Sequence, residues 1–271
     1  MRIGIIGGGV MGRIFLRHIE AGDLPGMQVV AVAGRGAQSK GRQLAGEFNV
    51  PFTVGLDALL AQKPDVVIES AGHDAVREYG EALLSHGIPL ILLSGGALAD
   101  DALRARLEAA AARHHALLYI PSGGIGGLDA LKAVNVAGVE SVTITVSKPA
   151  AAWKGIAYVE QQGFDMDRIT TPTVLYEGPV RQGAGYFPAN VNIAAALSMA
   201  GIGFDRTLMK VVADPALKFN THAIDIRGKT GNISLRFENV PAPDNPKTAW
   251  LACYSALAAL KELKGTVRYG T

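Results

Sequence analysis

Three glycines near the N-terminus have the spacing of a phosphate-binding turn. They stand as Gly7-x-Gly9-x-x-Gly12, after the apolar run Arg2–Ile6 and at the start of the helix-like stretch Met11–Ala21. In such a turn the first glycine permits the tight bend, and the second lets a pyrophosphate approach the backbone. The third lets the helix pack closely on the strand. The pattern therefore predicts a dinucleotide site.

The first turn of this helix should contribute to the same site. Backbone N–H groups at a helix N-terminus, here those of Val10 and Met11, attract phosphate oxygens. The alternative is a glycine-rich turn that binds no ligand. Strands and helices continue to alternate along the chain, which favours the ligand, and NAD or NADP is the expected cofactor.

The end of the second expected strand, Val29–Ala33, should discriminate between NAD and NADP. Proteins that prefer NAD usually place a carboxylate there, which bonds the ribose 2′-hydroxyl. This chain has Arg35, and Ser39, Lys40 and Arg42 follow it. A guanidinium can bind a 2′-phosphate with two hydrogen bonds, whereas a carboxylate would repel it. We expect NADP to be accepted; the alternative is that these are solvated charges at a helix start.

Two loops of small residues follow later strands. Glu69–Asp74 contains Ala71, and Ser94–Asp100 begins with Ser94. Ligands of open α/β sheets lie outside the carboxyl ends of the strands, so Ala71 and Ser94 are expected to contact the cofactor. A third loop, Pro121–Leu131, contains four glycines and is expected to line the site or to act as a hinge.

His222 is the candidate for proton chemistry. It follows Asn220 and Thr221 in a strand-like segment that ends in a tight turn at residues 228–231. A strand places Asn220, His222 and Ile224 on one face. An imidazole with a pKa of about 6.5 can gain or lose a proton near neutrality. The alternative is a histidine held by hydrogen bonds in the core, but its polar neighbours favour a catalytic role.

Strand-like and helix-like segments, which must position these residues, alternate over the first part of the chain. Short apolar runs predict strands at Arg2–Ile6, Val29–Ala33, Val66–Glu69, Pro89–Leu93 and Leu117–Ile120. Between them, helices are expected at Met11–Ala21, Ser39–Phe48, Asp74–His86 and Asp100–His114. This order predicts a Rossmann-type doubly wound parallel sheet of the α/β class.

The pattern changes after "IPSGGIGG". Strands are expected at Val139–Ser147, Leu208–Ala213, Thr221–Arg227 and Asn232–Glu238, and helices at Asn192–Ala200 and Lys247–Leu263. Short turns between some strands predict a mixed or antiparallel sheet in a smaller α/β domain. We therefore expect a dinucleotide-binding domain over residues 1–121 and a second domain over 122–244. A C-terminal helix within 245–271 is expected to pack back on the first domain.

The composition narrows the possible settings and partners. The chain has 271 residues, of which 49% are hydrophobic and 18% charged, so a large core is expected. A net charge of +2 argues against nucleic acid as the main partner. Cys253 is the single cysteine, no metal-ligand spacing is present, and no run has membrane-spanning length. With no secretory signal pattern at the N-terminus, a cytoplasmic protein is expected.

Taken together, several motifs resemble one enzyme family. In chain order they are "GIIGGGVMG", "ESAG", "SGGAL", "PSGGIGGLDAL", "FPANVNIAAALSMAG", "ADP", "NTHAIDIRGKTG" and "NPKTAWLA". The set resembles L-aspartate dehydrogenase over nearly the whole chain. The resemblance implies a Rossmann domain, a smaller domain over 122–244 that binds the substrate and forms a homodimer, and NAD- or NADP-dependent oxidation of L-aspartate. The product is iminoaspartate, which hydrolyses to oxaloacetate and ammonia or enters NAD biosynthesis.

The resemblance also implies roles for particular residues. The histidine of "NTH", His222, is the family's proposed catalytic residue, and Asn190 and Gly124 correspond to cofactor contacts. Many relatives have alanine at the position of Gly124. The chain also departs from the family pattern at Ala249, where serine is commoner, and in "KPAAAWKG" over Lys148–Gly155, where relatives are richer in proline.

The two carboxylates of aspartate need cationic or N–H partners once they leave water. Candidates for substrate binding are Lys148, Lys229, Asn192 and Asn220. Most lysines are solvated surface residues, and Asn190 or Asn192 could instead cap a helix.

Other functions remain open on the sequence alone. The first is another two-domain dehydrogenase, similar to homoserine dehydrogenase or dihydrodipicolinate reductase. The second is an NAD(P)-binding sensor without turnover, which would have no need of His222.

Overall fold

In the computed structural model of the chain, residues 1–188, 191–242 and 245–270 are described, with only the backbone at 245–248. The chain forms two compact units. The first contains Met1–Pro121 and Cys253–Val267, and the second contains Ser122–Ala252 and Arg268–Thr271. No described helix has the length and apolar character needed to cross a membrane.

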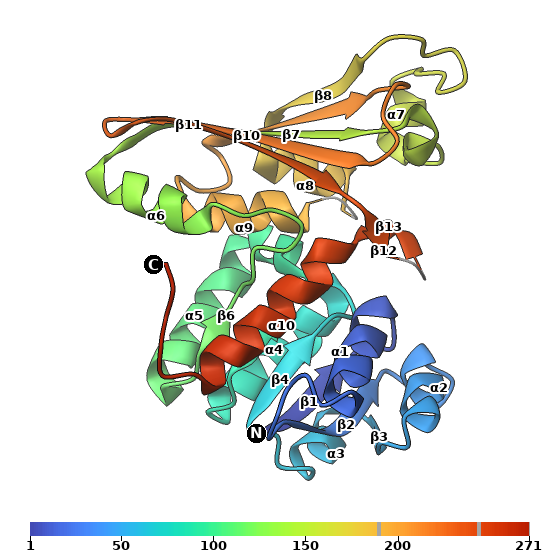
Figure 1. Ribbon diagram of the computed structural model, residues 1–271, viewed down its shortest axis with the longest axis vertical. Coiled ribbons are helices and arrows are strands. Elements are labelled where there is room, and N and C mark those ends of the chain that lie inside the picture. The colour runs from blue at the N-terminus through green and yellow to red at the C-terminus, as the bar shows by residue number, and fades with distance from the viewer. Residues whose placement is uncertain (189–190, 243–244, 271) are drawn as a thin grey trace. The chain divides into compact units, whose positions relative to one another are not determined.

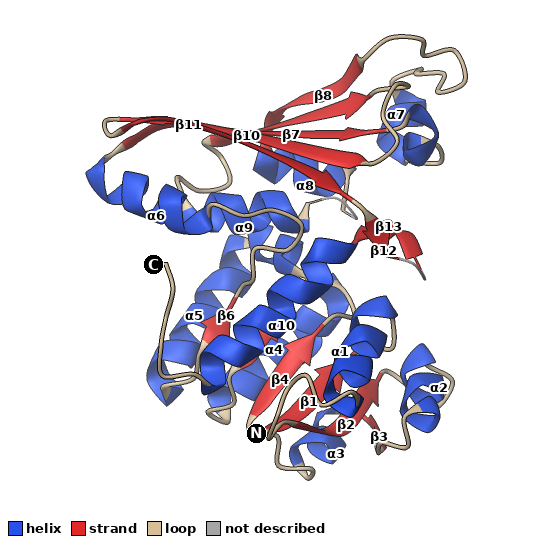
Figure 2. Ribbon diagram, viewed as in Figure 1, coloured by secondary structure: helices blue, strands red, loops and turns tan. Residues whose placement is uncertain are grey.

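The first unit is built on a six-stranded parallel sheet (Figures 1 and 2). Its strands are β1 (Arg2–Ile6), β2 (Gln28–Gly34), β3 (Phe52–Val54), β4 (Val66–Glu69), β5 (Leu90–Leu92) and β6 (Leu118–Tyr119). Their order is β3-β2-β1-β4-β5-β6, and β1 pairs in parallel with both β2 and β4. The order reverses between β1 and β4, which is where doubly wound sheets bind ligands. This confirms the predicted fold class.

Helices connect these strands and bury their apolar side chains. They are α1 (Val10–Glu20), α2 (Lys40–Glu47), α3 (Leu56–Leu60), α4 (His73–Ser85) and α5 (Asp101–His114), with a 3-10 turn at Gly95–Ala99. The last helix, α10 (Trp250–Lys264), contacts α1, since Cys253 Sγ lies 2.9 Å from Met11 Sδ. At its other end Glu262 accepts a hydrogen bond from the Tyr119 hydroxyl.

The second unit contains a five-stranded sheet of order β11-β10-β7-β9-β8. The strands are β7 (Val139–Lys148), β8 (Thr173–Pro179), β9 (Thr207–Ala213), β10 (Asn220–Gly228) and β11 (Gly231–Asn239). Strand β7 pairs in parallel with β9, and the other pairs are antiparallel, so the sheet is mixed. Strands β10 and β11 meet in a two-residue turn between Gly228 and Gly231, as the sequence predicts.

Helices cover one face of this second sheet (Figure 1). They are α6 (Leu128–Ala137), α8 (Val180–Tyr186) and α9 (Asn192–Ala200), while the short α7 (Ala157–Gln161) and a 3-10 turn at Ala150–Trp153 follow β7. Buried side chains at alternate positions of β7 and β10, such as Ile144, Val146 and Ile224, form the core of this unit. This alternation places His222 on the buried face of the sheet.

The structure differs from the sequence prediction in a few elements. Strands β3 and β8 are additional, as are the short helices α3, α7 and α8. The predicted start of the last helix is wrong, because Asn245–Ala249 forms strand β13 and pairs with β12 (Pro241–Ala242). The helix therefore begins at Trp250.

Candidate active site

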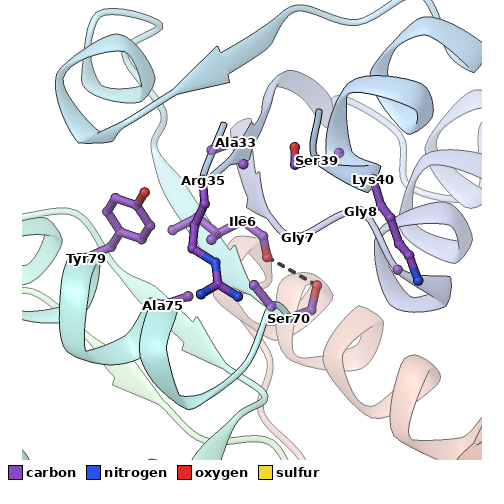
Figure 3. Close-up of a pocket in the computed structure, with 14 residues that line it drawn as sticks. Ile6, Gly7, Gly8, Ala33, Arg35, Ser39, Lys40, Ser70, Ala75 and Tyr79 are labelled. Carbon is purple, nitrogen blue, oxygen red and sulfur yellow. Dashed lines mark hydrogen bonds between the residues drawn. The ribbon is translucent and has the colours of Figure 1, made fainter. Parts of the chain in front are cut away.

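The first unit has a cavity of about 300 Å³ at the carboxyl ends of β1, β2 and β4 (Figure 3). It is lined by Ile6, Gly7, Gly8, Gly9, Ala33, Gly34, Arg35, Ser39, Lys40, Gly41, Ser70, Ala71, Ala75 and Tyr79. Four of the predicted cofactor residues, Gly7, Gly9, Arg35 and Ala71, are therefore brought together here. No acidic side chain lines the cavity among the residues that the structure describes.

Backbone packing explains most of the glycines in the loop. Gly7 has φ +116°, and a Cβ there would press on the backbone of Ser70 and Ala71. A Cβ on Gly12 would lie 3.0 Å from both Gly7 O and a Leu44 methyl carbon. Gly8, which the sequence pattern does not single out, is still more restricted. A Cβ on Gly8 would overlap the backbone at the start of α2.

Gly9 is the exception. Its φ of −84° and ψ of −168° are open to any residue, and, its two chain neighbours aside, no atom of the described residues lies within 4 Å of where its Cβ would be. Neither conformation nor packing therefore requires glycine at this position. The space beside it can take a ligand that approaches the backbone closely. Because α1 has no side-chain cap and no acidic residue in its first turn, its N-terminal N–H groups suit an anion such as a pyrophosphate.

The chain after β2 gives the cavity a cationic wall. In Figure 3 the Arg35 side chain points toward Ala75 and Ser70, and Ser39 and Lys40 lie on the side of α2. Arg35 makes only a loose ion pair with Asp74, at 3.6 Å, and both side chains are about 70% exposed. The Ser39 Oγ atom is buried and has no hydrogen-bond partner among the described residues. These groups fit a phosphate better than they fit a bare 2′-hydroxyl.

A buried carboxylate, which the sequence prediction missed, holds two loops at this edge of the sheet. Glu69 is 1% exposed and accepts hydrogen bonds from the N–H groups of Ala71 at 2.7 Å and Gly72 at 2.8 Å. It also accepts from Ser94, through its N–H at 3.1 Å and its hydroxyl at 3.0 Å. Burial raises the pKa of Glu69 above its ordinary value, and these bonds oppose the rise. The Ser94 hydroxyl thus serves Glu69, while Ala71 borders the cavity.

In the second unit, four polar residues lie at one end of one sheet face. His222 pairs with Val146 across β10 and β7, so Lys148, two positions further along β7, shares its face. Asn220 pairs with Asn239 across β10 and β11, and both lie on that face. The structure thus brings together three of the predicted residues, His222, Asn220 and Lys148, and adds Asn239. We call these four residues the histidine cluster.

Asn239 joins the histidine to a glycine-rich loop. Its Nδ2 atom lies 2.8 Å from His222 Nδ1 and 2.8 Å from Gly124 O. The loop approaches β11 closely because it is made of glycines; for example, a Cβ on Gly127 would overlap a Leu235 methyl carbon. His222 itself is 5% exposed. Burial, and secondarily the Lys148 charge, lowers the pKa of His222 to about 4.

The low pKa of His222 predicts that the stability of the folded protein depends on pH. The unfolded histidine takes up a proton near its ordinary pKa of 6.5, but the folded one does so only near 4. The unfolded state therefore binds more protons between these values, and stability is lost as the pH falls through this window. Relative to His222→Gln, the free energy of unfolding of the wild type should fall by about 2 kcal/mol from pH 7 to pH 5.

Urea unfolding at several pH values measures this difference. Glu69, whose raised pKa acts with the opposite sign, cancels in the comparison of the two proteins. His86→Gln, at an exposed histidine, is the matched control and should follow the wild type. Parallel curves for wild type and His222→Gln would contradict the assignment.

Three other residues that the sequence predicts for the site are Lys229, Asn192 and Asn190. Lys229 is exposed in the turn after β10 and lies beside Gly138. That turn is six or more positions from His222, or about 20 Å along the strand, so Lys229 does not join the cluster. Asn192 is the first residue of α9, whose N-cap is Val191, so it does not cap the helix. Asn190 lies outside the described residues.

The two point departures from the family pattern are neighbours in space. A Cβ on Gly124 would lie only 3.1 Å from the Cβ of Ala249. Such a separation is tight for two carbon atoms, so alanine at 124 would require a small shift of the chain here. Glycine at 124 and a small residue at 249 therefore fit each other.

Among the described residues, no group of acidic, histidine and cysteine side chains is arranged to hold a metal ion. The doubly wound sheet, its glycine loop and the cavity beside it define a dinucleotide-binding oxidoreductase. In agreement with this class, residues 7–121 match the family described as "Homoserine dehydrogenase, NAD binding domain". Residues 129–263 match the family described as "Aspartate dehydrogenase, C-terminal".

Similar proteins extend this match to the whole chain. L-aspartate dehydrogenase of Methanosarcina acetivorans is 40% identical over 100% of both chains, and L-aspartate dehydrogenase 2 of Bordetella pertussis is 41% identical over 96% of both. The crystal structure of aspartate dehydrogenase from Thermotoga maritima matches with a TM-score of 0.75 and 27% identity. It covers 100% of this chain and 99% of that one. The chain belongs to the L-aspartate dehydrogenase family.

Proposed function

We propose that the chain oxidises L-aspartate with NAD or NADP. The observation that carries this conclusion is its similarity to L-aspartate dehydrogenases over the full length. In the reaction the substrate Cα–H leaves as a hydride to the cofactor and the nitrogen loses a proton, which gives iminoaspartate. Water then converts the imine to oxaloacetate and ammonia.

Product stoichiometry tests this reaction. Purified protein given L-aspartate and NADP+ should form one reduced cofactor, one ammonia and one oxaloacetate for each aspartate consumed. Reduced cofactor without ammonia would indicate oxidation of a different kind and would refute deamination.

The residues around the cavity fit a nicotinamide dinucleotide. The open space beside Gly9 and the N–H groups of Val10, Met11 and Gly12 suit the pyrophosphate, and Ala71 borders the same space. Gly124 and Asn190 remain proposed contacts that rest on the family resemblance. When bound, the cofactor would supply the hydride acceptor, and these residues would hold it in place.

The cationic wall supports acceptance of NADP. We predict that Arg35→Ala weakens NADP+ binding by about 1.5–3 kcal/mol and changes NAD+ binding much less, since a charge-assisted bond to the 2′-phosphate is lost. Fluorescence titration with each reduced cofactor measures both affinities. Arg42→Ala removes the same charge from α2, outside the cavity lining, and should leave both affinities unchanged. Equal losses of both cofactors in Arg35→Ala would remove the 2′-phosphate assignment.

The histidine cluster is the proposed substrate site. Lys148 provides a cation and Asn220 an amide for the two carboxylates, and His222 is the proposed catalytic residue. The Lys148 Nζ atom lies 5.1 Å from the centre of the Trp153 ring, which limits where the ammonium can move. Lys229, which lies in the turn beyond the far end of β10, is a weaker candidate for this role, while Asn192, at the start of α9, remains a proposed contact.

We further propose a homodimer formed through the second unit, in a cytoplasmic protein whose product can enter NAD biosynthesis. Val174 and Leu208, on the adjacent strands β8 and β9, are exposed apolar side chains that support an interface there. Burial raises the pKa of the single cysteine, Cys253, to about 11, so its thiol is expected to be unreactive. Sedimentation at micromolar concentration should give twice the 28.3 kDa of one chain, and a monomeric mass would contradict the dimer.

A further inference from the structure

The side-chain amide of Asn239 has a well-defined orientation. Its Nδ2 atom faces two groups at once, Gly124 O and His222 Nδ1, each at 2.8 Å. A backbone carbonyl oxygen can only accept a hydrogen bond, so the atom beside it must be the NH₂ nitrogen rather than the amide oxygen. An NH₂ group has two hydrogens, and the second points to the imidazole.

The proton on the imidazole follows from this orientation. Because Asn239 donates to Nδ1, that ring nitrogen must offer its lone pair and carry no proton. A neutral imidazole then has its single proton on Nε2. We propose that Asn239 is a positioning residue that holds neutral His222 in this tautomer, so that the ring meets the bound dicarboxylate as a hydrogen-bond donor. The substrate part of this inference rests on the proposed function.

The surroundings of the ring favour the neutral form. Its partners on the neighbouring strands, Val146 and Phe237, are apolar, and the loop around Gly124 adds no charge. Among the described residues, the charged group that acts on the ring is Lys148, on β7, which opposes a second positive charge. The low pKa of His222 agrees with this setting, and protonation of Nδ1 would also break the bond to Asn239.

This tautomer changes the role expected for the histidine. A general base needs a free lone pair, but the lone pair of His222 is occupied by Asn239. The Nε2–H group has no hydrogen-bond partner among the described residues, so it can donate to a carboxylate oxygen of the substrate or to the carbonyl oxygen of oxaloacetate. The ammonium proton of aspartate therefore passes to an acceptor other than the ring, such as water, and the ring keeps its own proton throughout.

NMR of the free protein tests the tautomer directly. In protein labelled with ¹⁵N-histidine, long-range ¹H–¹⁵N spectra distinguish a protonated ring nitrogen from an unprotonated one, and the His222→Gln spectrum identifies the His222 signals. We expect protonated Nε2 and unprotonated Nδ1, without change, from pH 6 to pH 8. A proton on Nδ1, or a ring that titrates near pH 6.5, would overturn the proposal.

Asn239→Asp provides the complementary test. A carboxylate at 239 would accept a hydrogen bond from Nδ1–H and favour the charged ring, so the titration midpoint of His222 should rise by about two pH units or more. The pH profile of kcat/KM should show no imidazole ionisation between pH 5.5 and 8 in the wild type, and should gain one in the variant. A wild-type profile with an ionisation near 6.5 that His222→Gln removes would contradict the donor role.

The NMR spectra and the kinetic measurements test the tautomer of His222 and the proposed oxidation of aspartate separately. The spectra need no substrate, so they decide the tautomer even if the protein fails to oxidise aspartate. If Asn239→Asp does not fold, the wild-type spectrum still supports or overturns the assignment.

Discussion

Replacing His222 with alanine is expected to lower kcat with L-aspartate by about 10²–10⁴-fold, the range for losing a group that stabilises the transition state by a hydrogen bond or a proton transfer. The fold should survive, and the affinity for the reduced cofactor should be unchanged, because the cavity is built from other residues. His222→Asn should be impaired similarly, since the shorter amide cannot place an N–H where Nε2 lies.

Steady-state kinetics and cofactor titration measure the two parts of this prediction. His114→Ala, at an exposed histidine of α5, is the matched control and should keep full activity. A folded His222→Ala variant with near-normal turnover would make the histidine structural and end its catalytic assignment.

Two neighbouring glycines should respond to alanine in opposite ways. In Gly8→Ala the new Cβ overlaps the backbone at the start of α2, which cannot move without disturbing the helix. We expect a loss of about 3 kcal/mol or more in the free energy of unfolding. In Gly9→Ala the new Cβ meets no atom of the described residues beyond its chain neighbours, so stability should change by no more than about 1 kcal/mol.

Cofactor binding completes this comparison. Gly9→Ala should weaken NADP+ and NAD+ alike, by at least about tenfold, because the methyl group enters the space proposed for the pyrophosphate. Urea unfolding and fluorescence titration give both quantities for each variant. A Gly9→Ala protein with unchanged cofactor affinity would show that the phosphates lie elsewhere.

The sequence predicts the elements that carry a strong local pattern. The strands Arg2–Ile6 and Val66–Glu69 and the helix Asn192–Ala200 have the predicted bounds, because each is a continuous apolar run with a clear boundary. Strand β3 has three residues, too few to show a period. The segment Asn245–Ala249 forms a strand because it pairs with β12, and that long-range contact outweighs the local preference.

The site could be predicted only in part, for a similar reason. The glycine pattern and His222 are visible in the sequence, but the roles of Gly8, Glu69 and Asn239 depend on contacts with distant segments. Gly8 is confined by α2, Glu69 bonds Ser94, and Asn239 bonds Gly124. Lys229 is the opposite case: it is close to His222 in sequence, but it lies in the turn beyond the far end of the same strand.

The most direct test of the proposed function is a substrate panel read at the absorbance of the reduced cofactor. The protein is mixed with NADP+ or NAD+ and, separately, with L-aspartate, L-homoserine, L-alanine or L-glutamate. The account predicts reduction of the cofactor with L-aspartate far above the other three. Preference for L-homoserine, or cofactor binding with no reduction by any member of the panel, would contradict it.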